Sequence, residues 1–214
     1  AYTADAVIAR LAFSDDFNRT VASGWGTSSD GHPWLPADPG WGSVNGSVAF
    51  GSSHGYFSGF PNASVYAVQV DVLIPSSPVE AETAISLLSD RSTNRVAVYW
   101  TTFAGGRWLA NPYAGNSSIS SPFTLAAGWW TFRFTTDQND PSRSTVMLWP
   151  QGQPRPDFNN GVNGTTISGS LITSLDSASA FVTNEQVDNF QVWDMSGTFT
   201  WTPWALADAI LKRN

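Results

Sequence analysis

Carboxylates are few in this chain, and their spacing limits the acid–base chemistry that it can perform. A retaining glycosidase needs two carboxyl groups about 5–5.5 Å apart, one as nucleophile and one as acid and base. Glu80 and Glu82 stand two residues apart, so a strand would place both on one face. They follow Pro78 and are expected at the solvated entrance of a strand, where charges protect a sheet edge. A polysaccharide-cleaving enzyme, glycosidase or lyase, is therefore kept as an alternative function.

Two histidines offer a second kind of catalysis. His32 and His54 each lie in a segment rich in glycine and serine. A serine–histidine–acid relay or a histidine–tyrosine lyase couple would use one of them as a base. Histidines in such loops are more often solvated than catalytic, so no catalytic residue is assigned.

Aromatic side chains suggest sugar binding instead. The chain has 11 tryptophans, and indole rings can stack on the C–H faces of sugars. Most of these rings are expected to be core or loop anchors, because each covers much apolar area. A subset near Gly105 and Gly106, with one ring from a Pro-rich loop, is predicted to bind a ligand. These residues are Trp41, Trp100, Arg107, Trp108 and Tyr113.

Composition excludes several other functions. The net charge is −7, which repels phosphate backbones, so the sequence predicts no nucleic-acid binding. No apolar run approaches the roughly 20 residues needed to span a bilayer, so membrane insertion is not expected. With no cysteine, the chain has neither disulfides nor cysteine-ligated zinc.

The elements that must position these residues are predicted to be strands. Residues 65–74 alternate clearly, with Tyr66, Val68, Val70, Val72 and Ile74 on one face and Gln69 and Asp71 on the other. Similar alternation occurs in residues 84–88, 95–103 and 130–135. About ten to twelve short strands separated by turn residues predict an all-β, two-sheet antiparallel sandwich.

The two ends of the chain differ from this pattern. Residues 4–10 (ADAVIAR) and 207–213 (ADAILKR) are similar Ala-rich strings with an acid early and a base late. That charge order suits a helix dipole, so either string can form one or two helical turns. The predicted organisation is a connector over residues 1–10, a sandwich domain over 11–198 and a second connector over 199–214.

Residues at both ends of the predicted domain carry a family resemblance. Residues 15–19 (DDFNR), 24–27 (GWGT) and Trp34 resemble the opening of concanavalin A-like, LamG-like jelly-roll domains. Residues 187–194 (VDNFQVWD) are similar to the last strand of that family. The resemblance implies that the two segments close the sandwich, so the aromatic residues of 13–34 are expected to be buried rather than to bind a ligand. Laminarinase-type relatives carry both catalytic carboxylates on one strand as Glu-x-Asp-x-x-Glu, a string that this chain lacks.

The resemblance also implies a metal and a biological setting. In related sandwiches a structural calcium ion often joins the first strand to the last, and Asp16 and Asp188 match those ends. The alternative is that Asp15 or Asp16 caps the loop and that Asp188 bonds a neighbouring turn. Such domains occur in secreted actinobacterial proteins and in phage tail proteins, and residues 2–6 (YTADA) look like linkers of the latter.

Together these observations predict a non-catalytic carbohydrate-binding module. It is expected in a virion tail or outside the cell, where it would adhere to a host cell-surface glycan. A homotrimer formed through neighbouring virion modules is the expected assembly. A purely structural or oligomerisation domain is the second alternative to adhesion.

Overall fold

The computed structural model describes residues 5–36, 42–51, 56–59, 66–74, 82–88, 95–101, 107–112, 119–121, 126–136, 143–157, 164–168, 177–182 and 185–200. In the smaller of the two sheets the backbone alone is described. The regular elements in this part of the chain are all strands, and it holds no helix long and apolar enough to cross a membrane. The all-β prediction is therefore confirmed.

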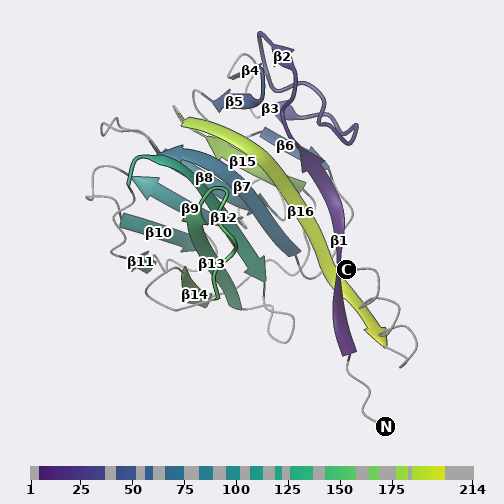
Figure 1. Ribbon diagram of the computed structural model, residues 1–214, viewed down its shortest axis with the longest axis vertical. Coiled ribbons are helices and arrows are strands. Elements are labelled where there is room, and N and C mark those ends of the chain that lie inside the picture. Colours follow the sequence, from purple (N-terminus) through teal and green to yellow (C-terminus); the bar gives the residue numbers. More distant parts are fainter. Residues whose placement is uncertain are drawn as a thin grey trace.

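The larger sheet has nine strands, all paired antiparallel (Figure 1). In spatial order they are β14 (Gly164–Ser168), β13 (Arg143–Pro150), β12 (Gly128–Thr136), β7 (Tyr66–Ile74), β16 (Glu185–Thr200), β5 (Val48–Gly51), β4 (Ser43–Asn45) and β2 (Thr20–Val21), with β1 (Asp5–Asp15) also paired to β16. The last of the described strands, β16, thus lies in the middle of this sheet.

The smaller sheet has seven strands and lies behind the larger one in Figure 1. In spatial order they are β11 (Ile119–Ser121), β10 (Arg107–Pro112), β9 (Arg95–Thr101), β8 (Glu82–Leu88), β15 (Ser177–Val182), β6 (Tyr56–Gly59) and β3 (Leu35–Pro36). Together the sheets form the two-layered antiparallel jelly-roll sandwich that the sequence predicts.

The inner face of the larger sheet forms the core. Val68, Val70, Val72 and Ile74 of β7 are at most 2% exposed, which confirms the face predicted from their alternation. Residues of the neighbouring strands continue this buried surface; they are Phe132, Phe134, Leu148, Val187 and Val192. The opposite face of the same strands is therefore the outer surface of the sandwich.

The N-terminal segment does not form the helical turns that its charge order allowed. Residues 5–10 belong to β1, where Asp5 pairs with Thr200 and Ala6 with Phe199. Ladder hydrogen bonds to β16 replace the intrahelical bonds that residues 5–10 would otherwise need. Residues 201–214 lie outside the described part, and the predicted division into connectors and domain stays a prediction.

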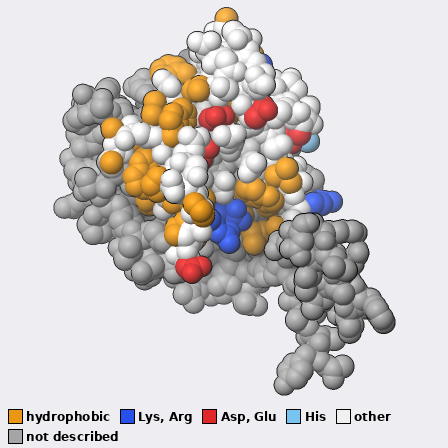
Figure 2. Space-filling model, viewed as in Figure 1, with side chains coloured by type: hydrophobic (Ala, Val, Ile, Leu, Met, Phe, Trp, Pro, Cys, Tyr) orange, Lys and Arg blue, Asp and Glu red, His pale blue; other side chains and the backbone are white. Residues whose placement is uncertain are grey.

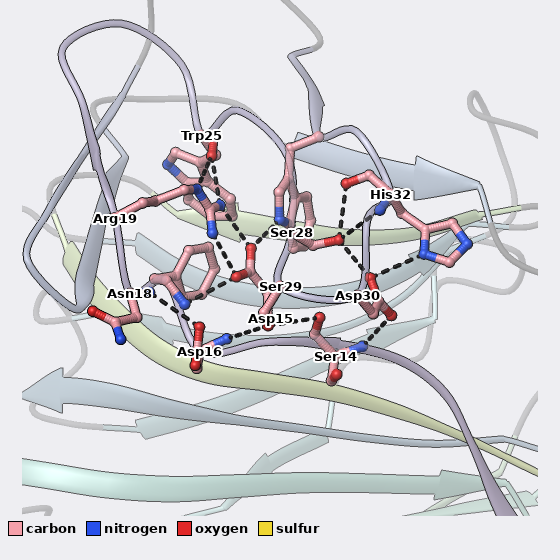
Figure 3. Close-up of polar contacts among 12 residues, drawn as sticks. Ser14, Asp15, Asp16, Asn18, Arg19, Trp25, Ser28, Ser29, Asp30 and His32 are labelled. Atoms are coloured by element: carbon pink, nitrogen blue, oxygen red, sulfur yellow. Dashed lines mark hydrogen bonds and ion pairs between the residues drawn. The ribbon is translucent and has the colours of Figure 1, made fainter.

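A buried carboxylate holds the chain after β1 in place (Figure 3). The Asp15 side chain is fully buried and accepts two hydrogen bonds from the Arg19 guanidinium, at 2.6 and 2.7 Å. It also accepts bonds from the Phe17 amide and the Trp34 indole N–H. Arg19 in turn donates to the carbonyl of Trp25. We call Asp15, Arg19 and these partners the Asp15 clasp.

Aromatic rings pack around the Asp15 clasp. Trp34 lies 5.1 Å from Trp25 and from Phe13, and 5.2 Å from Phe190 of β16, measured between ring centroids. Phe17 completes the cluster, and all five rings are at most 4% exposed. Edge-to-face packing of this kind adds about 0.5–1.5 kcal/mol per pair beyond area burial. The prediction that these aromatics close the sandwich is confirmed.

Asp15→Asn should destabilise the fold by about 3–5 kcal/mol, because Arg19 would lose its buried counter-charge. Urea denaturation at pH 7 measures the change in the free energy of unfolding. Arg10→Gln is the control, since Arg10 forms a 3.7 Å pair with Asp194 and its side chain is 68% exposed. That exposed pair should contribute about 0.5 kcal/mol or less. Equal losses in the two variants would contradict the central role of the Asp15 clasp.

Candidate functional site

Polar side chains occupy adjacent positions on the outer face of the larger sheet. Thr131 and Arg133 of β12 pair in register with Asp71 and Gln69 of β7. On the other side of β7, Gln191 of β16 pairs with Gln69. Register partners in a sheet share a face. Three neighbouring strands therefore present amide, carboxylate, hydroxyl and guanidinium groups on one surface.

A β-bulge in β16 brings a further polar group to this surface. The register of β16 against β7 shifts between Asp188 and Gln191, and Asn189 has a φ of 49°. Asparagine tolerates this left-handed conformation better than most residues. The Asn189 side-chain amide donates to Asp71 at 2.9 Å and to Asp188 at 3.2 Å. The bulge thus turns one amide nitrogen to lie between two carboxylates.

Asp71 is the buried anchor of the site. It is 6% exposed, and its Oδ1 accepts a hydrogen bond from the Thr131 hydroxyl at 2.6 Å. Its Oδ2 accepts from the Gln151 side chain at 2.8 Å, besides the bond from Asn189. A buried carboxylate is costly unless donors surround it. These bonds meet that requirement and fix the segment after β13 against the sheet.

Arg133 lies beside this anchor. Its Nη1 donates to the side-chain oxygen of Gln69 at 3.3 Å, and its guanidinium carbon lies 4.7 Å from the centroid of the Trp193 ring. Burial, together with repulsion from Arg155, lowers the pKa of Arg133 to about 10. Arg133 therefore stays charged at neutral pH.

These residues line a groove of about 520 Å³. That volume falls within the range of roughly 300–1,000 Å³ typical of small-molecule sites. Strands β7, β12 and β16 form its floor, Trp149 of β13 lines it, and residues 151–153 and 155 lie along it. Figure 2 shows this face, with acidic side chains towards the top and another below the basic group near the centre, a second basic group at the right, and hydrophobic side chains on both sides. We call it the outer-face groove.

The five residues predicted to bind a ligand do not line the outer-face groove. Trp100 and Trp108 are register partners in β9 and β10, and Arg107 pairs with Thr101 beside them. The structure thus brings three of the five together in the smaller sheet, where the backbone alone is described. Trp41 and Tyr113 lie outside the described residues. That these five bind a ligand stays a prediction.

The residues of the outer-face groove were not selected from the sequence. The alternation of β7 did place Gln69 and Asp71 on the face opposite the core, and Arg133 occupied a polar position in the alternation of β12. That signal identified a polar face for each strand separately. Which strands would be neighbours, and in which register, depends on long-range pairing that the sequence pattern does not carry.

Ser28, Asp30 and His32 form a compact polar cluster, but not a catalytic relay (Figure 3). The Ser28 hydroxyl donates to Asp30, and His32 Nδ1 contacts the same Asp30 oxygen at 2.9 Å. In a nucleophilic relay the imidazole must lie between serine and acid to take the serine proton. Here the carboxylate lies between them. Of the other candidate catalytic residues, His54 and Glu80 lie outside the described part, and only the backbone of Glu82 is described.

The predicted metal ligands have local partners. Asp16 is exposed after β1 and accepts a bond from the Asn18 amide at 3.1 Å, and Asp188 accepts one from the Asn189 amide at 2.7 Å. Burial and the nearby charges of Asp71, Asp16 and Asp15 raise the pKa of Asp188 to about 6, although the Asn189 bond opposes this shift. The described residues contain no group of three or more His, Cys, Asp or Glu side chains arranged to hold a metal ion.

Comparisons with solved structures identify the fold. A glycosyl hydrolase family protein from Mycobacterium fortuitum is 11% identical, with a TM-score of 0.55 over 86% of this chain and 100% of that chain. A β-1,3-glucanase from Mycobacterium marinum is 13% identical, with a TM-score of 0.51 over 86% and 99%. The exoplasmic/lumenal domain of VIP36, bound to Ca²⁺ and Man3GlcNAc, is 10% identical, with a TM-score of 0.51 over 80% and 86%.

These similarities support the concanavalin A-like jelly-roll fold that the sequence resemblance implied. At identities this low they show the fold alone. No protein-family model matches the sequence, and no curated protein matches it either.

Asp188→Asn should change how stability depends on pH. The pKa of Asp188 in the folded protein, about 6, lies above its ordinary value of 3.8, so folding favours the protonated form. The stability that this proton contributes is complete below about pH 4 and is lost as pH rises through 6. The neutral asparagine should remove this loss and raise the free energy of unfolding at pH 7 by about 1 kcal/mol, a value reduced for solvent screening.

Chemical denaturation between pH 4 and 7 measures the free energy of unfolding of the parent protein and of Asp188→Asn. Asp16→Asn is the control, because it removes one of the neighbouring charges and should reproduce only part of the effect. A variant less stable than the parent at pH 7 would show that the fold needs the Asp188 charge.

Proposed function

We propose that this protein binds carbohydrate in the outer-face groove. The observation that carries the proposal is the convergence of side-chain amides, a carboxylate and a guanidinium from three adjacent strands in one groove. Sugar hydroxyls both donate and accept hydrogen bonds, and the amides of Gln69, Gln191 and Asn189 can do the same. Sandwiches of this fold include sugar-bound domains, which agrees with the proposal.

The hydrogen bonding of Asp71, and the lack of a second carboxylate among the described groove-lining residues, favour binding over hydrolysis. Asp71 is the one carboxylate among the groove-lining residues in the described part of the chain. Both of its oxygens already accept hydrogen bonds from protein side chains, so it is suited to orient groups rather than to attack an anomeric carbon. A glycosidase would need a second carboxyl group facing the same space. Release of sugars from wall polysaccharide by the purified protein would contradict a purely binding role.

The setting that we propose is adhesion to a cell-surface glycan, within a phage tail or a secreted protein. It is supported by the sequence resemblance of residues 2–6 and 15–34. A homotrimer is proposed with the virion setting. Light scattering tests it, and a monomeric mass would count against the trimer.

Gln191→Ala and Gln153→Ala should weaken glycan binding about tenfold, which corresponds to about 1.4 kcal/mol for a lost polar contact. Both side chains line the groove, and neither has a side-chain hydrogen bond among those described. A glycan array identifies the best-bound oligosaccharide, and titration calorimetry with that compound gives the affinities. Circular dichroism confirms that each variant is folded.

Trp108→Ala is the matched comparison, since it removes a ring from the competing site in the smaller sheet. The outer-face proposal expects unchanged affinity in this variant. Loss of binding in Trp108→Ala with full binding in both glutamine variants would place the ligand on the smaller sheet. No binding of the parent protein to any glycan would contradict the function as a whole.

We also propose a structural calcium ion between Asp16 and Asp188. Calcium takes 6–8 oxygen ligands, many of them backbone carbonyls, so two carboxylates supply only part of a site. Burial and repulsion from Asp71, Asp16 and Asp15 raise the pKa of Asp188, and a cation would relieve that repulsion. Calcium should raise the melting temperature and a chelator should lower it, with both effects abolished in Asp188→Asn. An unchanged melting temperature in the parent protein would exclude the ion.

A further inference from the structure

Two arginines from different elements line the outer-face groove. Arg133 projects from the strand floor, and Arg155 follows the turn after β13. The two guanidinium groups are close enough for the charge of Arg155 to lower the pKa of Arg133. The chain has 10 basic residues in total against 17 acidic ones. Two guanidinium groups in one groove repel each other, so their placement there calls for a favourable interaction that offsets this repulsion.

Neither arginine has an anionic partner among the described residues. The ion pairs there join Arg10 to Asp194, Arg19 to Asp15 and His32 to Asp30. Arg133 contacts a neutral amide oxygen and an aromatic ring, which leave most of its N–H groups available. The groove carboxylate, Asp71, accepts from three other side chains instead. With two arginines and one carboxylate among its lining residues, the groove keeps a net positive charge.

The placement of Arg133 suits anion binding. Trp193 and Gln69 hold its guanidinium against the sheet, so little conformational entropy is lost when a ligand binds. A planar guanidinium offers paired N–H groups that match a carboxylate or phosphate. Arg155 is exposed and can approach the same anion from the other side. In a partly buried groove such contacts are screened less than on an open surface.

We propose that the outer-face groove is specific for acidic glycans, with an anionic substituent of the sugar bound between Arg133 and Arg155. This inference rests on the proposed carbohydrate function and names the class of sugar. The substituent is a carboxylate, as in a uronic acid, or a phosphate diester within the glycan chain. Both present oxygen pairs to the guanidinium groups, and the neutral amides of the groove remain for the hydroxyls.

Three probes test the proposal: an oligogalacturonate, its fully methyl-esterified form and a glycan polymer linked by phosphodiesters. The protein should bind one anionic probe at least tenfold more tightly than the neutral ester, and raising the salt concentration should reduce that preference. Arg155→Gln and Arg133→Gln should each remove most of the preference. Arg10→Gln removes the same charge outside the groove and should keep it.

Each outcome decides a separate point. Preference for the galacturonate indicates a carboxylate ligand, and preference for the phosphodiester polymer indicates a phosphate. Equal binding of charged and neutral probes, or an equal loss in Arg10→Gln, would overturn acidic selectivity and leave carbohydrate binding intact. Failure of these probes and of every neutral glycan to bind would overturn both. Arg155 is exposed, so its variant should fold even if Arg133→Gln does not.

Discussion

The buried ion pair of Asp15 and Arg19 is the constraint on which the candidate site depends. It fixes the loop after β1, and this loop supplies the Trp34 ring that packs on Phe190 together with Phe13 of β1. Phe190 is the neighbour of Asn189 in the β16 bulge, and Asp15 is its register partner. The bulge in turn places the Asn189 amide on Asp71 at the floor of the groove. A clasp at one edge of the sheet is thereby connected, contact by contact, to the proposed binding surface.

The sequence pattern predicted the local elements well and their arrangement poorly. Alternation identified β7 and its buried face, because side-chain burial has the same period as the strand. The motif at residues 15–34 also indicated which aromatics would be buried. It could not show that Gln69, Arg133 and Gln191 would share a surface, since that depends on pairings between residues far apart in the chain. The strands β2 and β3 were missed for a different reason. Each has only two residues, and so short a segment shows no alternation of apolar and polar side chains.

Charges of opposite sign lie in and beside the outer-face groove. Burial, with the charges of Asp71, Asp16 and Asp15, raises the pKa of Asp188, whereas burial, with the charge of Arg155, lowers the pKa of Arg133. A ligand with an anionic group at one end would bind in one orientation, because the reverse orientation would place that group beside the carboxylates. In the proposed glycan complex, charge would therefore select the direction of the bound chain, and the amides of the groove would contribute affinity.

The position of β16 has a consequence for synthesis of the protein. This strand is made after every other strand in the described part of the chain, yet it lies between β7 and β1 in the finished sheet. Until it leaves the ribosome, β7 has an unpaired edge and Phe13 and Trp34 lack the ring of Phe190. Pairing between segments so distant in sequence is slow, and unpaired edges can aggregate. The larger sheet therefore cannot close until β16 has been synthesised.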